Sequence, residues 1–175
     1  MTVYKHKVVE SFGSTPVAVG SVLYWDGTDW IALAPGTSGE TLETQGSGSA
    51  PVWVPKDIKI GIAASDETTD LEVGTDKAAF RVPTTMTLTE VRASVTTAPT
   101  GSTIIVDINK NGATVLSTKL SIDAGEKTSE TAAVPAVISV SALSDDDEIT
   151  IDIDQIGSTI AGTGLKIWVI GTTLS

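Results

Sequence analysis

The chain has 175 residues, a formal net charge of −11 and no cysteine. Without cysteine it has no disulfides and no thiolate chemistry. Eleven lysines and arginines scattered along an acidic chain do not form the basic surface that binds nucleic acid or an anionic membrane. No apolar run approaches the roughly 20 residues that cross a bilayer, and the first residues lack the apolar core of a signal peptide. We therefore expect no membrane insertion and no export by a leader of its own.

The first segment, residues 3–9, is basic and rich in β-formers, which fits a first strand or an arm bound to a partner equally well. His6 is the only histidine and lies between Lys5 and Lys7. A lone imidazole beside two cations is expected in solvent, because a metal site would lack its second histidine.

Residues 21–53 are rich in turn formers and carry three tryptophans. The apolar pairs Tyr24-Trp25 and Trp30-Ile31 flank Asp-Gly-Thr-Asp, a pattern that predicts a β-hairpin. Leu42 is the only large aliphatic residue between positions 34 and 51, so the segment cannot build a core. Its aromatic side chains must be buried against the next domain or against other copies of the chain. We expect an oligomerisation or docking interface formed by Tyr24, Trp25, Trp30 and Trp53.

The composition changes near residues 55–58, which predicts two domains, residues 1–57 and 58–175. Ile58, Ile60 and Ile62 alternate with other residues, as in a half-buried strand. Beyond Met86, the apolar residues change phase near Thr89-Glu90, which predicts a β-bulge. The further strands are expected at residues 78–82, 86–95, 103–108, 114–122, 149–154 and 165–170, with 66–76 a loop or weak edge strand and 125–133 a strand or loop.

About eight strands separated by turn residues, with no helical periodicity, are typical of an antiparallel sandwich. The predicted fold class is all-β, a jelly-roll-like β-sandwich preceded by a turn-rich β-hairpin module.

Two acidic segments are candidate cation sites. Residues 107–112 match the first half of a helix-loop-helix calcium loop, but Thr118 stands where the bidentate Glu is needed and the flanks are strands, so a hairpin is favoured. Residues 145–148 could supply oxygen ligands to Ca²⁺ or Mg²⁺, although such a run more often forms a solvated turn. Many carboxylate pairs exist, Asp152 and Asp154 among them, and nothing marks one as catalytic. We expect no enzyme, no metal and no cofactor.

Trp168 lies opposite the apolar face of its strand, between Ile167 and Val169. An outward tryptophan can stack on a sugar ring, but tryptophans more often pack in a core or an interface. Trp168 is therefore the candidate for surface recognition, with packing as the alternative.

The sequence of residues 22–53 resembles a module that recurs in bacteriophage tail-fibre and related virion proteins. It has a D-G-T-x-W hairpin, then P-G-T-S-G, an L-x-T-x-G element and a terminal A-P-x-W. The C-terminal stretch is similar to C-terminal domains of phage virion proteins, notably at residues 91–102, 106–109 and 164–166.

This resemblance implies a homotrimeric fibre or spike, assembled in the bacterial cytoplasm, whose first part docks on other virion proteins. Its β-sandwich tip is expected to meet a host-surface glycan or protein. A long shaft is missing, which favours a short spike, on head or tail. The alternatives are a capsid decoration (cement) protein and a non-viral carbohydrate-binding module.

Overall fold

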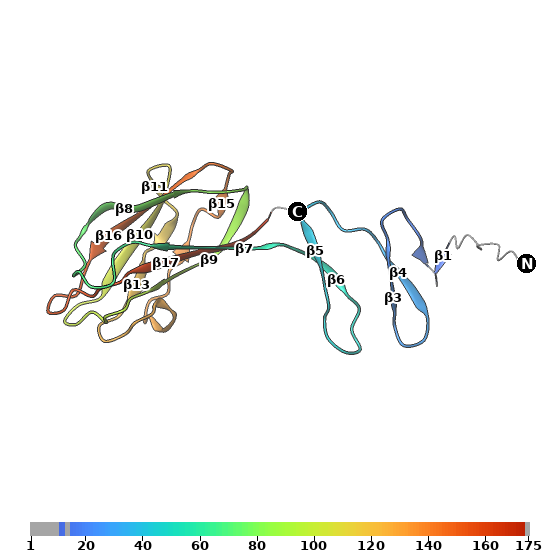
Figure 1. Cartoon of the computed structure of the whole chain (residues 1–175), viewed down its shortest axis with the longest axis horizontal. Helices are drawn as coiled ribbons and strands as arrows, with labels where there is room; N and C mark the ends of the chain where they lie inside the picture. Colours follow the sequence, from blue (N-terminus) through green and yellow to red (C-terminus); the bar gives the residue numbers. More distant parts are fainter. Residues whose placement is uncertain (1–10, 13–14, 174–175) are drawn as a thin grey trace, which may run out of the picture. The chain divides into compact units, whose positions relative to one another are not determined.

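The computed structural model describes residues 11–12 and 15–173 (Figure 1). Apart from one turn of 3-10 helix, η1 (Ser129–Thr131), its regular elements are all β-strands, so the all-β class is confirmed. The chain divides into two compact units between Lys56 and Asp57, one residue from the boundary expected from composition. The expected strand or arm at residues 3–9 lies outside the described residues. No described helix is long and apolar enough to cross a membrane.

The first unit consists of short antiparallel hairpins. They are β1 (Ser11–Phe12) with β2 (Thr15–Pro16), β3 (Val22–Trp25) with β4 (Trp30–Leu33), and β5 (Glu40–Glu43) with β6 (Val52–Pro55).

The hairpin predicted around Asp26 and Gly27 is confirmed. Asp26 Oδ1 accepts hydrogen bonds from the backbone N–H groups of Thr28 (2.7 Å) and Asp29 (2.8 Å), and Gly27 supplies the positive φ of 107° that the turn requires. Among residues 17–56 only Ala32 is buried. The first unit therefore has no hydrophobic core in its described part.

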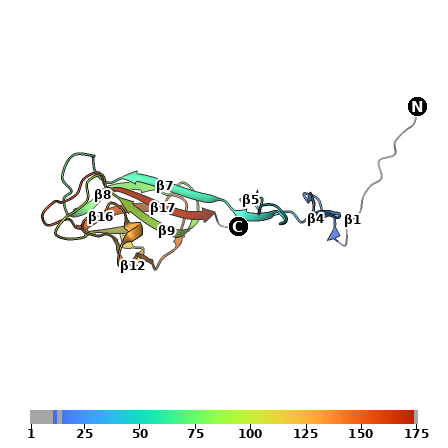
Figure 2. The ribbon, with the colours of Figure 1, turned by 90° about the horizontal axis from the view of Figure 1, so that it is seen from below.

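The second unit is a sandwich of two antiparallel sheets, whose strands β7, β17 and β9 can be followed side by side in Figure 2. One sheet has the order β15 (Ala142–Leu143), β9 (Met86–Ser94), β17 (Lys166–Thr173), β7 (Asp57–Ala63). The other has the order β11 (Ala113–Thr114), β10 (Ile104–Lys110), β16 (Glu148–Gln155), β8 (Gly74–Arg81), with β13 (Leu120–Ile122) also on β10. A small pair, β12 (Leu116–Thr118) with β14 (Val137–Ile138), completes the unit.

The connections between these sheets have jelly-roll character. The chain crosses to the other sheet from β7 to β8, from β8 to β9, from β9 to β10, and again from β15 to β16 and β16 to β17. The two long central pairs, β10 with β16 and β9 with β17, therefore join strands that are far apart in sequence. This is the double Greek-key arrangement of a jelly roll.

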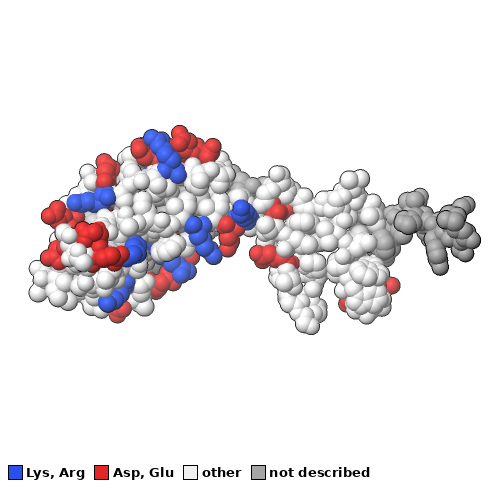
Figure 3. All heavy atoms as spheres, in the orientation of Figure 1, with Lys and Arg blue, Asp and Glu red and all other residues white. Residues whose placement is uncertain are grey.

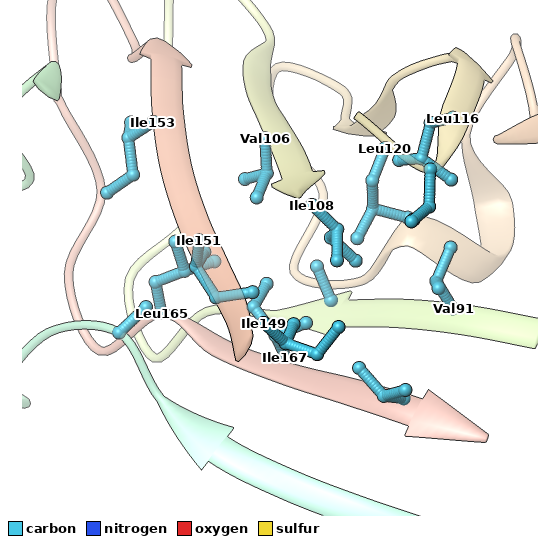
Figure 4. Packing of buried hydrophobic residues seen from close by; sticks show 14 of the residues in the cluster. Val91, Val106, Ile108, Leu116, Leu120, Ile149, Ile151, Ile153, Leu165 and Ile167 are labelled. Carbon is cyan, nitrogen blue, oxygen red and sulfur yellow. The ribbon is translucent and has the colours of Figure 1, made fainter. Parts of the chain in front are cut away.

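The core lies between the two sheets. Alternate residues of β10 and β16 point inward, and Ile104, Val106, Ile108, Ile149, Ile151 and Ile153 are each at most 1% exposed. Figure 4 shows Ile149 and Ile151 directed toward Leu165 and Ile167 from the facing sheet. The predicted alternation of apolar residues in these strands is thus confirmed, and it produces one hydrophobic core between the two sheets.

The predicted bulge in β9 is also confirmed. Ile170 of β17 pairs with Glu90, whereas the next residue, Gly171, pairs with Leu88, so Thr89 is the extra residue. Leu88 and Val91 are three residues apart and would face opposite sides of a regular strand. The bulge lets both reach the core, at 3% and 8% exposure.

The structure differs from expectation in the return strand after Gly112. Residues 114–122 were expected to form one strand, but they break into β11, β12 and β13, and β12 pairs with β14 instead of β10. Residues 125–133 form a loop with the turn η1, one of the two expected alternatives. β8 begins at Gly74, inside the segment expected as a loop or weak edge strand.

The carboxylate of Asp66 holds the loop after β7 by hydrogen bonds. Its pKa can be measured, which tests whether these bonds form. Asp66 Oδ1 accepts hydrogen bonds from the N–H groups of Thr69 (2.7 Å) and Thr68 (2.8 Å). These bonds, that of Thr69 foremost, lower the pKa of Asp66 from 3.8 to about 2. Asp66 backbone C=O also accepts from Gly164 N–H at 3.0 Å, which ties the loop to the start of β17.

We expect an NMR titration of the Asp66 carboxyl to give a midpoint near pH 2. Because the folded pKa is below the unfolded value, the contribution of Asp66 to stability is complete above about pH 4 and is lost as the pH falls toward 2. Asp66→Asn keeps an oxygen acceptor but cannot ionise, so the loop should lose this pH dependence. A wild-type midpoint near 3.8 would show that the hydrogen bonds do not form.

Candidate functional site

The first unit brings two of the expected interface residues, Trp25 and Trp30, into direct contact. They form the cross-strand pair nearest the turn, with ring centroids 5.8 Å apart and an interplanar angle of 65°. Edge-to-face pairs of this kind stabilise a hairpin. Even so, the side chains remain 54% and 52% exposed, so the pair presents a large aromatic surface.

Both faces of this hairpin are apolar, which the sequence pattern had indicated only in part. Trp25, Trp30, Leu23 and Ala32 share one face by their cross-strand pairing. Tyr24 and Ile31, with Val22 and Leu33, make up the other, so all eight strand residues are apolar. A hairpin exposed to water on one side would show polar residues there. The sequence does contain a signal for two apolar faces, because apolar and polar residues do not alternate in the strands on either side of the turn.

Tyr24 is half-buried and, with Trp25, lines a hollow of about 290 Å³ between the two larger hairpins of the first unit. The turn residues Asp26 and Gly27 form one wall, and residues 48–50 of the loop between β5 and β6 form the other. Both hairpins therefore contribute to one concave surface at their turns.

Trp53 has a different role: its side chain holds the β5–β6 hairpin against the segment that precedes it. Its indole Nε1 donates a hydrogen bond to the backbone C=O of Ala34 at 2.8 Å. Its ring also lies against Gly36, where a Cβ atom would come within 2.6 Å of Trp53 Cδ2. Trp53 is half-buried by these contacts, so it offers less free surface than Trp25 and Trp30.

Trp53→Phe should loosen the β5–β6 hairpin, because phenylalanine cannot donate to Ala34. Losing one such bond costs about 1 kcal/mol, so amide hydrogen exchange in residues 40–55 should accelerate by about fivefold. Trp25→Phe is the matched control, because no hydrogen bond of its indole N–H is found among the described residues. Equal acceleration in both variants would mean that the Ala34 bond contributes nothing.

Trp168 lies in the second unit, on the outer face of its sheet, and is 44% exposed. Its strand neighbours Ile167 and Val169 are 0% and 1% exposed, so the predicted opposition of Trp168 to the core is confirmed. It pairs across the sheet with Gly61 of β7 and Arg92 of β9. These two neighbours were not identified from the sequence, because the register between distant strands cannot be read from it.

The acidic segments considered for cations are occupied by contacts within the protein. Asp107 accepts hydrogen bonds from Thr114 Oγ1 (2.5 Å) and Ile108 N–H (2.9 Å), and Lys119 Nζ lies 3.0 Å from it. Residues 107–112 run through the β10–β11 hairpin and do not flank a helix.

In the second acidic segment, Asp147 accepts from Ser144 N–H at 2.6 Å and from Asn111 Nδ2 at 2.7 Å, and Lys110 Nζ lies 3.0 Å away. These bonds, that of Ser144 foremost, lower the pKa of Asp147. Glu148 pairs with Arg81 at 3.4 Å. Within the described part of the chain, no three acidic or histidine side chains gather in a way that could hold a metal ion.

Charged side chains are unevenly distributed between the two units. Figure 3 shows them concentrated on the second unit in the face drawn, while the first unit is largely uncharged there. Among residues 17–56 the charged residues are only Asp26, Asp29, Glu40, Glu43 and Lys56. Depletion of charge together with exposed aromatics is typical of the centre of a protein interface.

No protein-family model matches this chain, and no curated protein matches its sequence. The class defined by the structure is therefore that of an all-β protein with a jelly-roll sandwich and a coreless hairpin unit.

Proposed function

We propose that this chain is a structural protein of a bacteriophage virion, a short homotrimeric fibre or spike that attaches to the host surface. Residues 1–57 dock it and join its copies, and residues 58–175 form the displayed sandwich. The resemblance of residues 22–53 to a module of phage tail-fibre proteins supports the class of protein.

The observation that carries the proposal is the two-faced apolar hairpin β3–β4. Isolated hairpins are marginal in water, and this one exposes two tryptophans and Leu23 (39%) without a core beneath them. Other copies of the chain can cover both faces at once if the hairpins pack about a symmetry axis. No residue of β3 or β4 is charged, so the strands themselves bring no like charges together in such packing.

The sandwich has the opposite properties, which suit display. Its buried apolar residues form one core of its own, and its surface carries ion pairs such as Lys119 with Asp154 at 2.5 Å. Asp107 and Asp154 are both paired with Lys119, and Asp152 accepts hydrogen bonds from Asp76 N–H and Asn109 Nδ2. This supports a structural and binding role for the unit in place of a catalytic one.

Three measurements test the proposal. Light scattering should give the mass of three chains of 18.0 kDa, and a monomer at micromolar concentration would contradict the assembly role. The purified protein should bind host cells and block phage adsorption. If it bound capsid shells but never cells, it would be a decoration protein instead, and immunogold labelling of intact particles would show whether it lies on head or tail.

A further inference from the structure

The outer face of the β7–β17–β9 sheet holds an aromatic ring in a fixed, supported position. Gly61 faces Trp168 across the strands, and a Cβ atom there would come within 2.7 Å of Trp168 Cζ3 and 2.9 Å of Cη2. The six-membered ring of Trp168 therefore lies over the Gly61 backbone, where any other residue would displace it. With 44% of the residue exposed, the ring is supported by the strand and still open to solvent.

The rim of this surface is made of charged side chains that pair with one another. Arg92 Nε lies 2.5 Å from Glu90 Oε1 and 3.2 Å from Glu130 Oε1. On the β7 side, Lys59 Nζ lies 3.4 Å from Asp57 Oδ2. With Trp168 and Ile170, four of these residues line a hollow of about 430 Å³, a size usual for small-molecule sites.

The exposed ring of Trp168 and the paired charges around it limit the class of ligand that this hollow can bind. A phosphate or carboxylate ligand would require an unpaired cation, and both cations here already have carboxylate partners. An apolar ligand would require an enclosed apolar cavity, whereas this hollow is bordered by polar groups. A sugar ring fits both properties, because its C–H face packs on a flat aromatic ring and its hydroxyls can both donate to Glu90 or Asp57 and accept from Arg92 or Lys59.

We propose that this surface binds a neutral saccharide unit of a host-surface polysaccharide, with the ring of Trp168 as the stacking platform. Glu90, Arg92, Asp57 and Lys59 bond to its hydroxyls, and Gly61 positions the ring. The inference rests on the proposed function, since it assigns the ligand class and the residues of the attachment step. It also explains why a large aromatic residue occupies an outward position of the sheet.

The test is a titration of the full-length protein with neutral oligosaccharides of glucose, galactose and N-acetylglucosamine, followed by ¹H–¹⁵N NMR. At least one sugar should shift the Trp168 indole N–H and the Gly61 amide, while the indole signals of Trp25, Trp30 and Trp53 stay in place. The Trp168 signal is identified by its absence from Trp168→Ala.

Three variants make the result specific. Trp168→Ala should weaken sugar binding at least about tenfold, since buried aromatic anchors contribute above 1.4 kcal/mol. Gly61→Ala keeps the indole but displaces it, so it should weaken binding as well. Ile160→Ala is the matched control, because Ile160 is similarly exposed (43%) in the same unit and its loss should change nothing. Circular dichroism verifies that each variant remains folded.

Four outcomes would overturn the inference. One is no shift of the Trp168 signal with any of these sugars up to about 10 mM, well above a weak millimolar affinity. A second is binding that survives in Trp168→Ala. The third is reduced cell binding by Trp168→Ala that no sugar competes with, which would indicate a protein receptor. If the wild type blocks adsorption but Trp168→Ala blocks it equally, this site fails and the proposed function stands; if the wild type never binds cells, the proposed function itself fails.

Discussion

Trp25→Ala and Trp30→Ala should each weaken self-assembly while leaving the sandwich folded. Both residues are more than half exposed and lie on one face of a hairpin that has no core, so in the proposed assembly it is other copies of the chain that cover them. Aromatic anchors at the centre of an interface commonly contribute 2 kcal/mol or more, which corresponds to a dissociation constant raised by about thirtyfold. Sedimentation velocity over a concentration series measures this constant directly.

The control for this prediction is Trp168→Ala, the same chemical change at a similarly exposed residue in the other unit. It should sediment like the wild type. Urea unfolding of the sandwich should have the same midpoint in Trp25→Ala as in the wild type, because Trp25 belongs to the other compact unit and contributes nothing to the sandwich core. If Trp25→Ala lowered sandwich stability as much as it weakened assembly, the division into an assembly unit and a display unit would be wrong.

The strands of the sandwich could be predicted because their signal is local. Ile149, Ile151 and Ile153 alternate with polar residues, and burying one face of a strand imposes this period of two on its sequence. The bulge in β9 could be predicted for the same reason, since two apolar residues of opposite phase, Leu88 and Val91, both need the core. The alternation of apolar and polar residues shows which side of a strand is buried and which faces water, so it can be read without knowledge of distant contacts.

Contacts between distant residues could not be predicted, because they depend on strand register. Nothing near Trp168 indicates that Gly61, more than a hundred positions away, will lie beneath its ring. The bond from Trp53 to the Ala34 carbonyl depends in the same way on how the second hairpin folds back. The break between β11 and β13 arises because β12 pairs with β14, a competing partner that local periodicity does not reveal.

Ile151→Ala should destabilise the sandwich more than any surface change. Ile151 is 0% exposed in the central strand β16, where it pairs with Ile108 on one side and Ala78 on the other. Removing its buried methyl and methylene groups loses transfer free energy and leaves a cavity that two flanking strands hold open, at a cost of about 3 to 4 kcal/mol. Urea unfolding of the full chain, followed by far-ultraviolet circular dichroism, should show a lower midpoint with an unchanged slope.

The matched control for this core substitution is Ile105→Ala. Ile105 lies in the neighbouring strand β10 but faces outward and is only half-buried, so the same change there should cost about 1 kcal/mol or less. Ile151 belongs to the core of the second unit, so Ile151→Ala should leave the β3–β4 hairpin of the first unit unaffected, and the Trp25 and Trp30 indole signals should persist after the sandwich has unfolded. Loss of all signals in one transition would instead mean that the sandwich supports the hairpins. Equal destabilisation by Ile105→Ala would contradict the assignment of the core to the space between the sheets.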